Sequence, residues 1–290
     1  MKRNLIFLPI TILALVTLAC GVNINLPIDT DLKTGPTISD EINVPPPDDP
    51  GVTAEVSFSF GAGEFSLSPG AGSNLIAGEA TYNVDDFKPE VEISNHEVIV
   101  NQGNLEIRGI PRIDDKVINN WDFQLGEHPM DLTIKSGGYV GDFELGGLSL
   151  VSLHLSDGAS DVDLTFSQPN LLEMQSLRYE TGASEVKLKG LANANFSTMV
   201  FQSGAGNYEL DFSGTLQRDA IAFVETGLSN LTILVPQEFN AEVTVEGGLN
   251  NISVRGDWLG SGDTYTLSND GPQLTITVEM GAGNLTLDNP

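Results

Sequence analysis

Short stretches of alternating hydrophobic and polar residues recur from about residue 52 onward, each arranged around a glycine. The seven regular copies read GAGEFSL at 61, GASDVDL at 158, GASEVKL at 182, GAGNYEL at 204, GLSNLTI at 227, GLNNISV at 248 and GAGNLTL at 281. An irregular eighth copy, GYVGDFEL, begins at 138. Successive side chains of a strand point to opposite faces, so the alternation predicts two short, half-buried strands around a corner in each copy.

Four positions relative to the glycine are apolar in all seven regular copies: five and three residues before it, and four and six residues after it. The position three residues before, for example, holds Phe58, Leu155, Tyr179, Phe201, Val224, Val245 and Val278. We expect these four positions to form the core. The repeat corners themselves are Gly61, Gly158, Gly182, Gly204, Gly227, Gly248 and Gly281. Glycine suits a corner because it adopts a positive φ at little steric cost, and small neighbouring residues let successive corners stack closely.

The spacing of the glycines decides between two folds. From Gly158 to Gly248 the successive intervals are 24, 22, 23 and 21 residues. Near-equal periods of this size are typical of solenoids, in which each repeat buries its apolar face against its neighbours. An all-β fold is therefore predicted, specifically a β-solenoid resembling a parallel β-helix with about 21–24 residues per turn. A β-sandwich of hairpin repeats is the alternative, because the same alternation permits it.

Residues 83–135 depart from the repeat and contain Trp121. Alternation predicts strands at Glu92–Val100 and Leu105–Ile110, joined as a hairpin by residues 101–104. We expect this part to pair with the first turns or to cap them, because terminal repeats of such arrays need a cap.

The N-terminus has the layout of an export signal. Lys2 and Arg3 precede an apolar stretch from Leu5 to Leu18, which is shorter than the roughly 20 residues that a membrane-spanning helix needs. Cys20, the only cysteine, follows Ala19. The sequence Thr17-Leu18-Ala19-Cys20 resembles the lipobox of bacterial lipoproteins, although Thr17 stands where that motif usually has leucine. The resemblance implies lipidation of Cys20, and ordinary signal cleavage is the alternative.

The expected organisation has four parts. Residues 1–19 form a lipoprotein-type signal peptide, and residues 20–51, with six prolines and several acidic residues, form a lipid-anchored tether. Residues 52–150 and 151–290 are β regions, expected to be continuous with each other. Loss of Lys2 and Arg3 with the signal leaves 11 basic and 40 acidic residues, a formal charge of −29. Such a surface repels nucleic acid, and its carboxylates are interpreted mainly as keeping a repetitive β surface soluble.

Several segments resemble a known family. They are FGAGEFSLSPGAGSNLIAGEATYN at Phe60–Asn83, WDFQL at Trp121, and MDLTIKSGGYVGDFELGGLSL at Met130–Leu150. Together they are similar to the toast-rack N-terminal domain, and the later copies are similar to the "putative adhesin" β repeats. The resemblance implies repetitive β domains outside or beside the membrane, some of them attached to membrane regulators of envelope stress, and it brings no catalytic residues.

The sequence offers little chemistry. His96, His128 and His154 lack metal-site spacing and are interpreted as surface residues. Asp157, Asp161 and Asp163 are candidate calcium ligands, but the calcium-binding nonapeptide is missing, and a polar ladder is the favoured interpretation of the corner positions. No catalytic residue, other metal site or cofactor is predicted. Three Asn-x-Ser/Thr sequons, at Asn230, Asn251 and Asn284, coincide with repeat corners.

These observations predict a non-enzymatic, exported lipoprotein on the outer face of a bacterial cell membrane, acting as a structural or adhesin-like scaffold. An envelope-sensing or cell-wall glycan-binding component is the first alternative. The second is a carbohydrate-active enzyme on a β-helix, because paired carboxylates would suffice for that chemistry. The expected partners are the membrane, through the anchor, and an envelope protein or glycan, but not nucleic acid.

Overall fold

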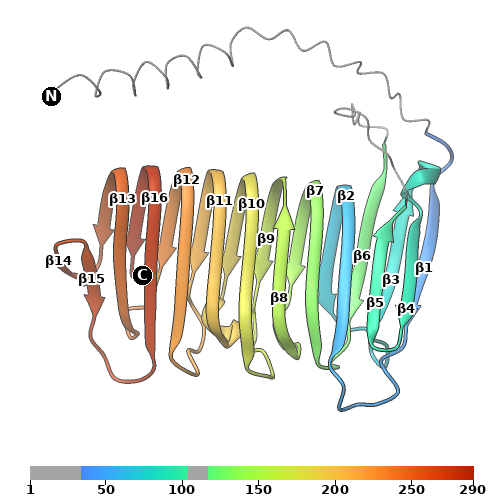
Figure 1. The fold of residues 1–290 in the computed structure, drawn as a ribbon, viewed down its shortest axis with the longest axis horizontal. Coiled ribbons are helices and arrows are strands. Elements are labelled where there is room, and N and C mark those ends of the chain that lie inside the picture. Colours follow the sequence, from blue (N-terminus) through green and yellow to red (C-terminus); the bar gives the residue numbers. More distant parts are fainter. Residues whose placement is uncertain (1–33, 104–116) are drawn as a thin grey trace, which may run out of the picture. The chain divides into compact units, whose positions relative to one another are not determined.

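A computed structural model describes residues 34–103 and 117–290 (Figure 1). One sheet system of 16 strands dominates this part of the chain, and the two helices that it contains are 3-10 helices, η1 (Asp85–Phe87) and η2 (Leu191–Ala194). The strands are β1 (Ile38–Val44), β2 (Ala54–Pro69), β3 (Ile76–Tyr82), β4 (Pro89–Ser94), β5 (Glu97–Gln102), β6 (Asn119–Leu125), β7 (Met130–Glu144), β8 (Leu150–Asp157), β9 (Ala159–Thr165), β10 (Met174–Lys189), β11 (Phe196–Asp211), β12 (Ala220–Leu234), β13 (Asn240–Arg255), β14 (Leu259–Ser261), β15 (Thr264–Leu267) and β16 (Gln273–Asp288).

The repeats stack as a solenoid. Every neighbouring pair of strands in the stack is parallel. The order is β2, β7, then β8 and β9 together as one coil, followed by β10, β11, β12, β16 and β13. The predicted β-solenoid is confirmed, and the hairpin sandwich is excluded because neighbouring repeats are parallel. Figure 1 shows these coils side by side, with tight corners along one edge and longer loops along the other.

The predicted apolar positions form the core. The residues three positions before the corner are all buried, and each pairs in register with the next one along the stack. In order they are Phe58, Ile134, Leu155, Tyr179, Phe201, Val224, Val278 and Val245. Polar residues between them point outward, as alternation requires. Each coil therefore buries its apolar side chains against the coils before and after it.

Close stacking explains the corner glycines. A Cβ added to a corner glycine would lie 2.3–3.0 Å from the carbonyl oxygen of the glycine in the preceding coil. This holds for Gly137, Gly158, Gly182, Gly204, Gly227, Gly281 and Gly248. The expectation of positive φ at these corners was wrong, because the positive values fall on other glycines, such as Gly63 (137°) and Gly283 (139°). The irregular copy also aligns one residue earlier than expected, on Gly137, since Gly138 pairs with Ala62 and Ala159.

The last strand does not lie at the end of the stack. β16 inserts between β12 and β13, so the coil of Gly281 separates the coils of Gly227 and Gly248. The inserted strand places Ile276, Leu285 and Leu287 in sites where they are fully buried. The first half of β13 also pairs with β15, but its second half pairs with β16 alone, and there the smaller Val254 remains 38% exposed. Larger apolar side chains thus occupy the position with a neighbour on both sides, where burial stabilises most.

The other end of the stack is capped by shorter strands. β5 and β6 both pair with β2 and run parallel to it. Beyond them the pairing is antiparallel, with β3 on β6, β1 on β3 and β4 on β5. The expected capping role of this region is confirmed. Strand β1 lies within the segment predicted to be a tether, and it buries Ile42 and Val44, so the prediction of a tether through residue 51 was wrong for this strand.

The predicted hairpin in this cap was also misplaced. Residues 92–100 do not form one strand, because the chain turns at Asn95 and His96 and pairs β4 with β5. Asn95 adopts φ 56°, a conformation that asparagine tolerates better than most residues. The predicted second strand at Leu105–Ile110 lies outside the described residues, as do the signal segment and Cys20. Within residues 34–103 and 117–290, no helix is long and apolar enough to cross a bilayer.

Candidate interaction face

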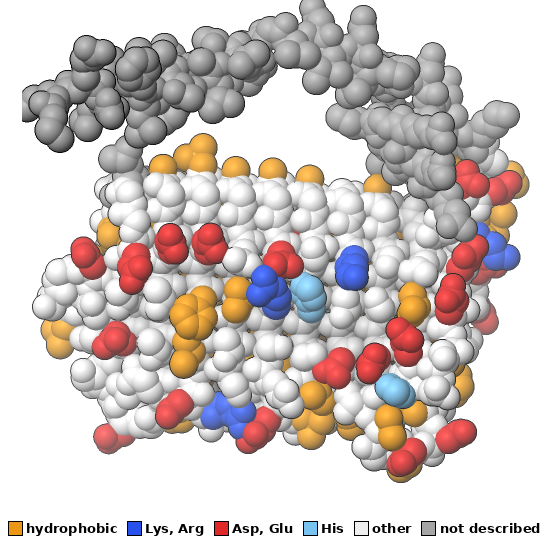
Figure 2. Space-filling view, in the orientation of Figure 1, with side chains coloured by type: hydrophobic (Ala, Val, Ile, Leu, Met, Phe, Trp, Pro, Cys, Tyr) orange, Lys and Arg blue, Asp and Glu red, His pale blue; other side chains and the backbone are white. Residues whose placement is uncertain are grey.

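One face of the solenoid presents the residues that precede the corners. Two outward rows run across the strands, four and two residues before each corner glycine. The row four residues before contains Ser57, Thr133, His154, Arg178, Val200, Phe223, Thr277 and Thr244. The row two residues before contains Ser59, Lys135, Ser156, Glu180, Gln202, Glu225, Glu279 and Glu246. Figure 2 shows this face, with basic and histidine side chains near its centre and acidic side chains toward the β13 end.

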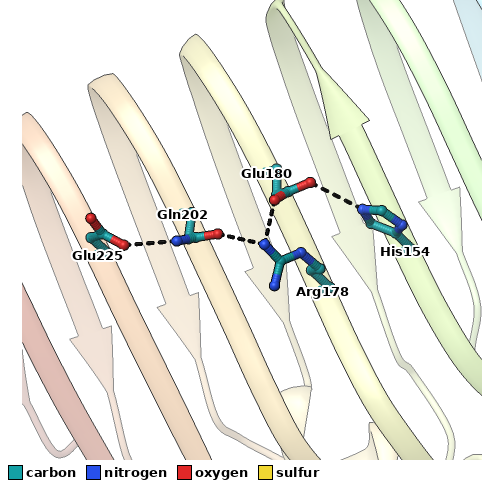
Figure 3. A network of polar contacts seen from close by, with 5 residues as sticks. All are labelled: His154, Arg178, Glu180, Gln202 and Glu225. Atoms are coloured by element: carbon teal, nitrogen blue, oxygen red, sulfur yellow. Dashed lines mark hydrogen bonds and ion pairs between the residues drawn. The ribbon is translucent and has the colours of Figure 1, made fainter.

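Five of these side chains form a polar network across four strands (Figure 3). His154 Nε2 lies 3.1 Å from Glu180 Oε2, and Arg178 Nη2 lies 2.5 Å from Glu180 Oε1. Arg178 Nη2 also donates to Gln202 Oε1 at 2.7 Å, and Gln202 Nε2 donates to Glu225 Oε2 at 2.7 Å. The network therefore fixes the orientation of the Gln202 amide and of the Glu225 carboxylate on the surface.

Electrostatics keep Glu180 ionised. The hydrogen bond from Arg178 and then the one from His154 lower the pKa of the Glu180 carboxyl from its ordinary value. A catalytic general acid needs the opposite shift, which burial or a neighbouring carboxylate produces. Glu180 is therefore suited to ordering its neighbours rather than to donating a proton.

A shallow hollow of 390 Å³ opens beside this network, toward the corners. It is lined by residues of β8, β10, β11 and β12, namely Ser156, Asp157, Glu180, Thr181, Gly182, Gln202, Ser203 and Glu225. Hydroxyl, amide and carboxylate groups predominate. The hollow therefore offers hydrogen-bonding groups in a row across the strands.

Asp157, a predicted calcium candidate, binds neighbouring hydroxyl groups instead. Its Oδ2 accepts from the Tyr179 hydroxyl at 2.9 Å and from the Tyr139 hydroxyl at 3.4 Å, and its Oδ1 accepts from Thr181 Oγ1 at 2.5 Å. Burial, together with the nearby Asp157 charge, raises the pKa of both tyrosines well above the ordinary value. The side chains stay protonated and donate to the carboxylate.

The other two calcium candidates lie past the corner, on the second half of the coil. Asp161 is exposed at a position three residues after the corner, and Asp163 Oδ1 pairs with Lys189 Nζ at 2.7 Å. Among the described residues, no group of three or more acidic, histidine or cysteine side chains is arranged to hold a metal ion. The structure thus separates Asp157 from Asp161 and Asp163 by the corner.

An asparagine ladder crosses the opposite face. Asn251 Nδ2 donates to Asn284 at 3.4 Å, Asn284 Nδ2 to Asn230 at 2.7 Å, and Asn230 Nδ2 to Asn207 at 2.8 Å. The polar ladder expected at these positions is present, and all its bonds run in one direction. Three of its members are the sequon asparagines of the repeat corners.

The remaining histidines take no part in the network. His96 Nε2 is 3.2 Å from Glu55 Oε1, and His128 Nε2 is 2.8 Å from the Val52 carbonyl oxygen. Each histidine therefore has a local partner.

Sequence reasoning missed an exposed apolar cluster next to the network. Phe223 is 47% exposed and Ile221 is 44% exposed, both on β12, and the half-buried Val200 on β11 is the register partner of Phe223. Figure 2 shows hydrophobic side chains gathered over β11 and β12 on this face. The signal was available in the row four residues before the corner, where polar residues give way to Val200 and Phe223.

Together the fold and this face define a β-solenoid that presents ordered rows of side chains. Residues 33–175 match the family described as the N-terminal domain of toast_rack, a longer range than the predicted 52–150. The resemblance inferred from the sequence is confirmed for that range.

A solved structure extends the fold similarity over most of the chain. A "putative cell adhesion protein" from Clostridium sporogenes has 15% identity and a TM-score of 0.50, and the match covers 88% of this chain and 100% of that one. A "putative adhesin" from Bacteroides fragilis has 11% identity and a TM-score of 0.45, with 87% and 97% covered. A "Putative lipid binding protein" from Parabacteroides distasonis has 9% identity and a TM-score of 0.40, with the same coverage. A search of curated proteins gives no match.

Proposed function

We propose that this chain is an exported lipoprotein, held on the outer face of a bacterial membrane through Cys20, whose solenoid serves as a non-enzymatic, adhesin-like interaction scaffold. The observation that carries the proposal is the polar network from His154 to Glu225, which orders side chains from four successive strands on one face. An ordered surface loses little conformational entropy when a partner binds, which favours recognition.

The contacts within the network favour binding over catalysis. Glu180 is held ionised by Arg178, and the Asp157 carboxylate is occupied by three hydroxyl donors. A glycoside hydrolase needs one carboxylic acid that is protonated near neutral pH. The environment of Glu180 and the hydroxyl contacts of Asp157 instead suit fixed roles in a surface. The solved structure from Clostridium sporogenes is described as a "putative cell adhesion protein", which agrees with this role.

The anchor is tested by metabolic labelling with an alkyne-bearing fatty acid in the native bacterium. We expect label on the full-length protein and none on the Cys20→Ala variant. External protease should also degrade the folded protein in intact cells. Label retained by Cys20→Ala, or protection from protease, would contradict the proposed location.

The scaffold role is tested by photo-crosslinking from the proposed face in whole cells. A photoreactive amino acid replaces Ser156, which lines the hollow but does not take part in the network. The matched control replaces exposed Glu238, in the loop after β12. We expect adducts with an envelope component from position 156 only. Equal capture from both positions, or none from either, would contradict the role of this face.

A further inference from the structure

We propose that the platform formed by Val200, Gln202, Phe223 and Glu225 on β11 and β12 binds a neutral polysaccharide. The inference rests on the proposed scaffold function and names the class of its ligand. The four residues are two register pairs, Val200 with Phe223 and Gln202 with Glu225, so the apolar pair and the polar pair lie next to each other.

The apolar pair supplies a surface for stacking. The Phe223 side chain is 47% exposed, with Val200 beside it and Ile221 two residues away on the same strand. Aromatic side chains contribute a large apolar area in a fixed orientation. The C–H face of a pyranose ring is a flat apolar surface of similar width, so it can cover Phe223 without burying a polar group.

The polar pair supplies oriented hydrogen bonds. Arg178 donates to Gln202 Oε1, and Gln202 Nε2 donates to Glu225 Oε2. Among the described residues, no hydrogen bond to Glu225 Oε1 is present. A carboxylate oxygen accepts hydrogen bonds, so Glu225 Oε1 can accept from a sugar hydroxyl. The combination of one aromatic face with a few fixed polar groups is typical of small-molecule recognition.

Charge selects a neutral ligand. Glu225, Glu279 and Glu246 are register partners on β12, β16 and β13, which places three carboxylates in a row next to the platform. The charge of Arg178 is offset by Glu180, and the whole chain carries a formal charge of −27. An anionic polymer is therefore repelled from this end of the face.

The size of the apolar cluster argues against a protein occupant. Stable protein interfaces bury about 800 Å² on each partner, with an apolar core of several side chains. The cluster comprises three side chains, Val200, Ile221 and Phe223, and a row of carboxylates borders it. Such an area fits one or two sugar rings better than a second copy of this chain.

The test is affinity electrophoresis of the full chain in gels that contain a polysaccharide. Two of the polymers, hydroxyethyl cellulose and glycol chitin, are neutral, and the third, polygalacturonate, is anionic. We expect retardation by at least one neutral polymer and none by polygalacturonate. Phe223→Ala should reduce the association constant at least fivefold, whereas Phe223→Tyr, which keeps the aromatic face, should remain within twofold of the parent. Leu228→Ala is the matched control, because Leu228 is 65% exposed on the same strand but lies at the corner.

Three results would overturn the inference: no retardation by either neutral polymer, equal retardation of the Phe223→Ala variant, or equal retardation by polygalacturonate. Sedimentation that detects a dimer lost in Phe223→Ala would assign the cluster to a second copy and would also overturn it. Urea unfolding of each variant shows that the fold is intact. If glycan binding fails while Cys20 is labelled and position 156 crosslinks as expected, the polysaccharide ligand is rejected and the proposed scaffold function is retained.

Discussion

Gly182 is packed so closely on Gly158 that a Cβ at position 182 would lie 2.3 Å from the Gly158 carbonyl oxygen. Contacts of this kind continue through the coils from Gly137 to Gly248, and they set how tightly the corners can stack. We expect Gly182→Ala to lower the free energy of unfolding by about 2–4 kcal/mol, because the neighbouring backbone has to move. Urea unfolding monitored by circular dichroism measures the change.

The control is Gly138→Ala, which lies one residue past the corner of its coil. An added Cβ there would meet the Ala159 carbonyl oxygen at 3.6 Å, an ordinary contact. We expect a change of less than about 1 kcal/mol. Similar losses in the two variants would mean that stacking distance does not explain the corner glycines.

The asparagine ladder should show pairwise coupling. Removing Asn230 breaks bonds to both Asn284 and Asn207, so Asn230→Ala should lower the free energy of unfolding by about 1–2 kcal/mol. A double-mutant cycle between Asn230 and Asn284 should give a coupling energy of about 0.5–1.5 kcal/mol. The cycle between Asn207 and Asn251, which have no common ladder partner, should give a value near zero. Coupling of equal size in the two cycles would contradict a ladder of local bonds.

Alkaline pH should destabilise the protein through the buried tyrosines. The pKa of Tyr179 is raised well above 10.0 by burial first and then by the nearby Tyr139 and Asp157 charges. In the unfolded chain the same hydroxyl ionises near pH 10, so the stability it contributes is present below pH 10 and is lost as the pH rises above it. We expect the urea midpoint to fall between pH 9 and pH 11.5.

The variant Tyr179→Phe identifies the origin of that loss. It lacks the ionisable group, so its midpoint should fall less steeply above pH 10. At pH 7 it should be less stable by about 1.5–3 kcal/mol, because a hydrogen bond to the Asp157 carboxylate is removed. An unchanged alkaline slope would show that another group controls it.

Acid should weaken the network on the proposed face. The pKa of Glu180 is lowered from 4.5, so its contribution to stability is complete above that pH and disappears as the pH falls through the lower, folded-state value. The effect should be below about 1 kcal/mol, since the side chains of Arg178 and Glu180 are 41% and 36% exposed. Stability measured from pH 6 to pH 3 should change less in Arg178→Gln than in the parent, and equal changes would exclude the pair as the cause.

Alternation and spacing in the sequence predict the solenoid, its period and its core, because each coil buries the same four positions against its neighbours. Leu155 and Tyr179, for instance, are 24 residues apart and pair in register as expected. Local patterns could not predict the place of β16, because the four apolar positions are equally apolar in β13 and β16. The two strands differ in burial, because Leu287 of β16 is fully buried whereas its register partner Val254 of β13 is 38% exposed.

The face was harder to predict than the fold. His154 was expected to point outward and does, but its partner Glu180 lies 26 residues further along the chain. The register that the repeat predicts places Arg178 beside His154 and Glu180 beside Ser156, so the contact between His154 and Glu180 is diagonal. Which neighbour an outward glutamate contacts depends on side-chain conformation, and the register does not fix that. The network could therefore be identified only from the structure.

Because β16 lies between β12 and β13, this C-terminal strand is needed to hold β13 in the stack, although β13 precedes it in the chain. A chain ending at residue 268 keeps β13 but removes the only strand that joins it to β12 in the described part of the stack. A shorter chain ending at Leu234 instead leaves β12 as an intact terminal coil. We expect the shorter chain to be soluble and to unfold cooperatively, whereas the longer one should aggregate, because β12 and β13 both expose unpaired edges and apolar side chains. Expression, sedimentation and hydrogen exchange of the two truncations measure the difference. Better behaviour of the longer chain would show that β13 can pair with β12 directly and that the inserted order is not required.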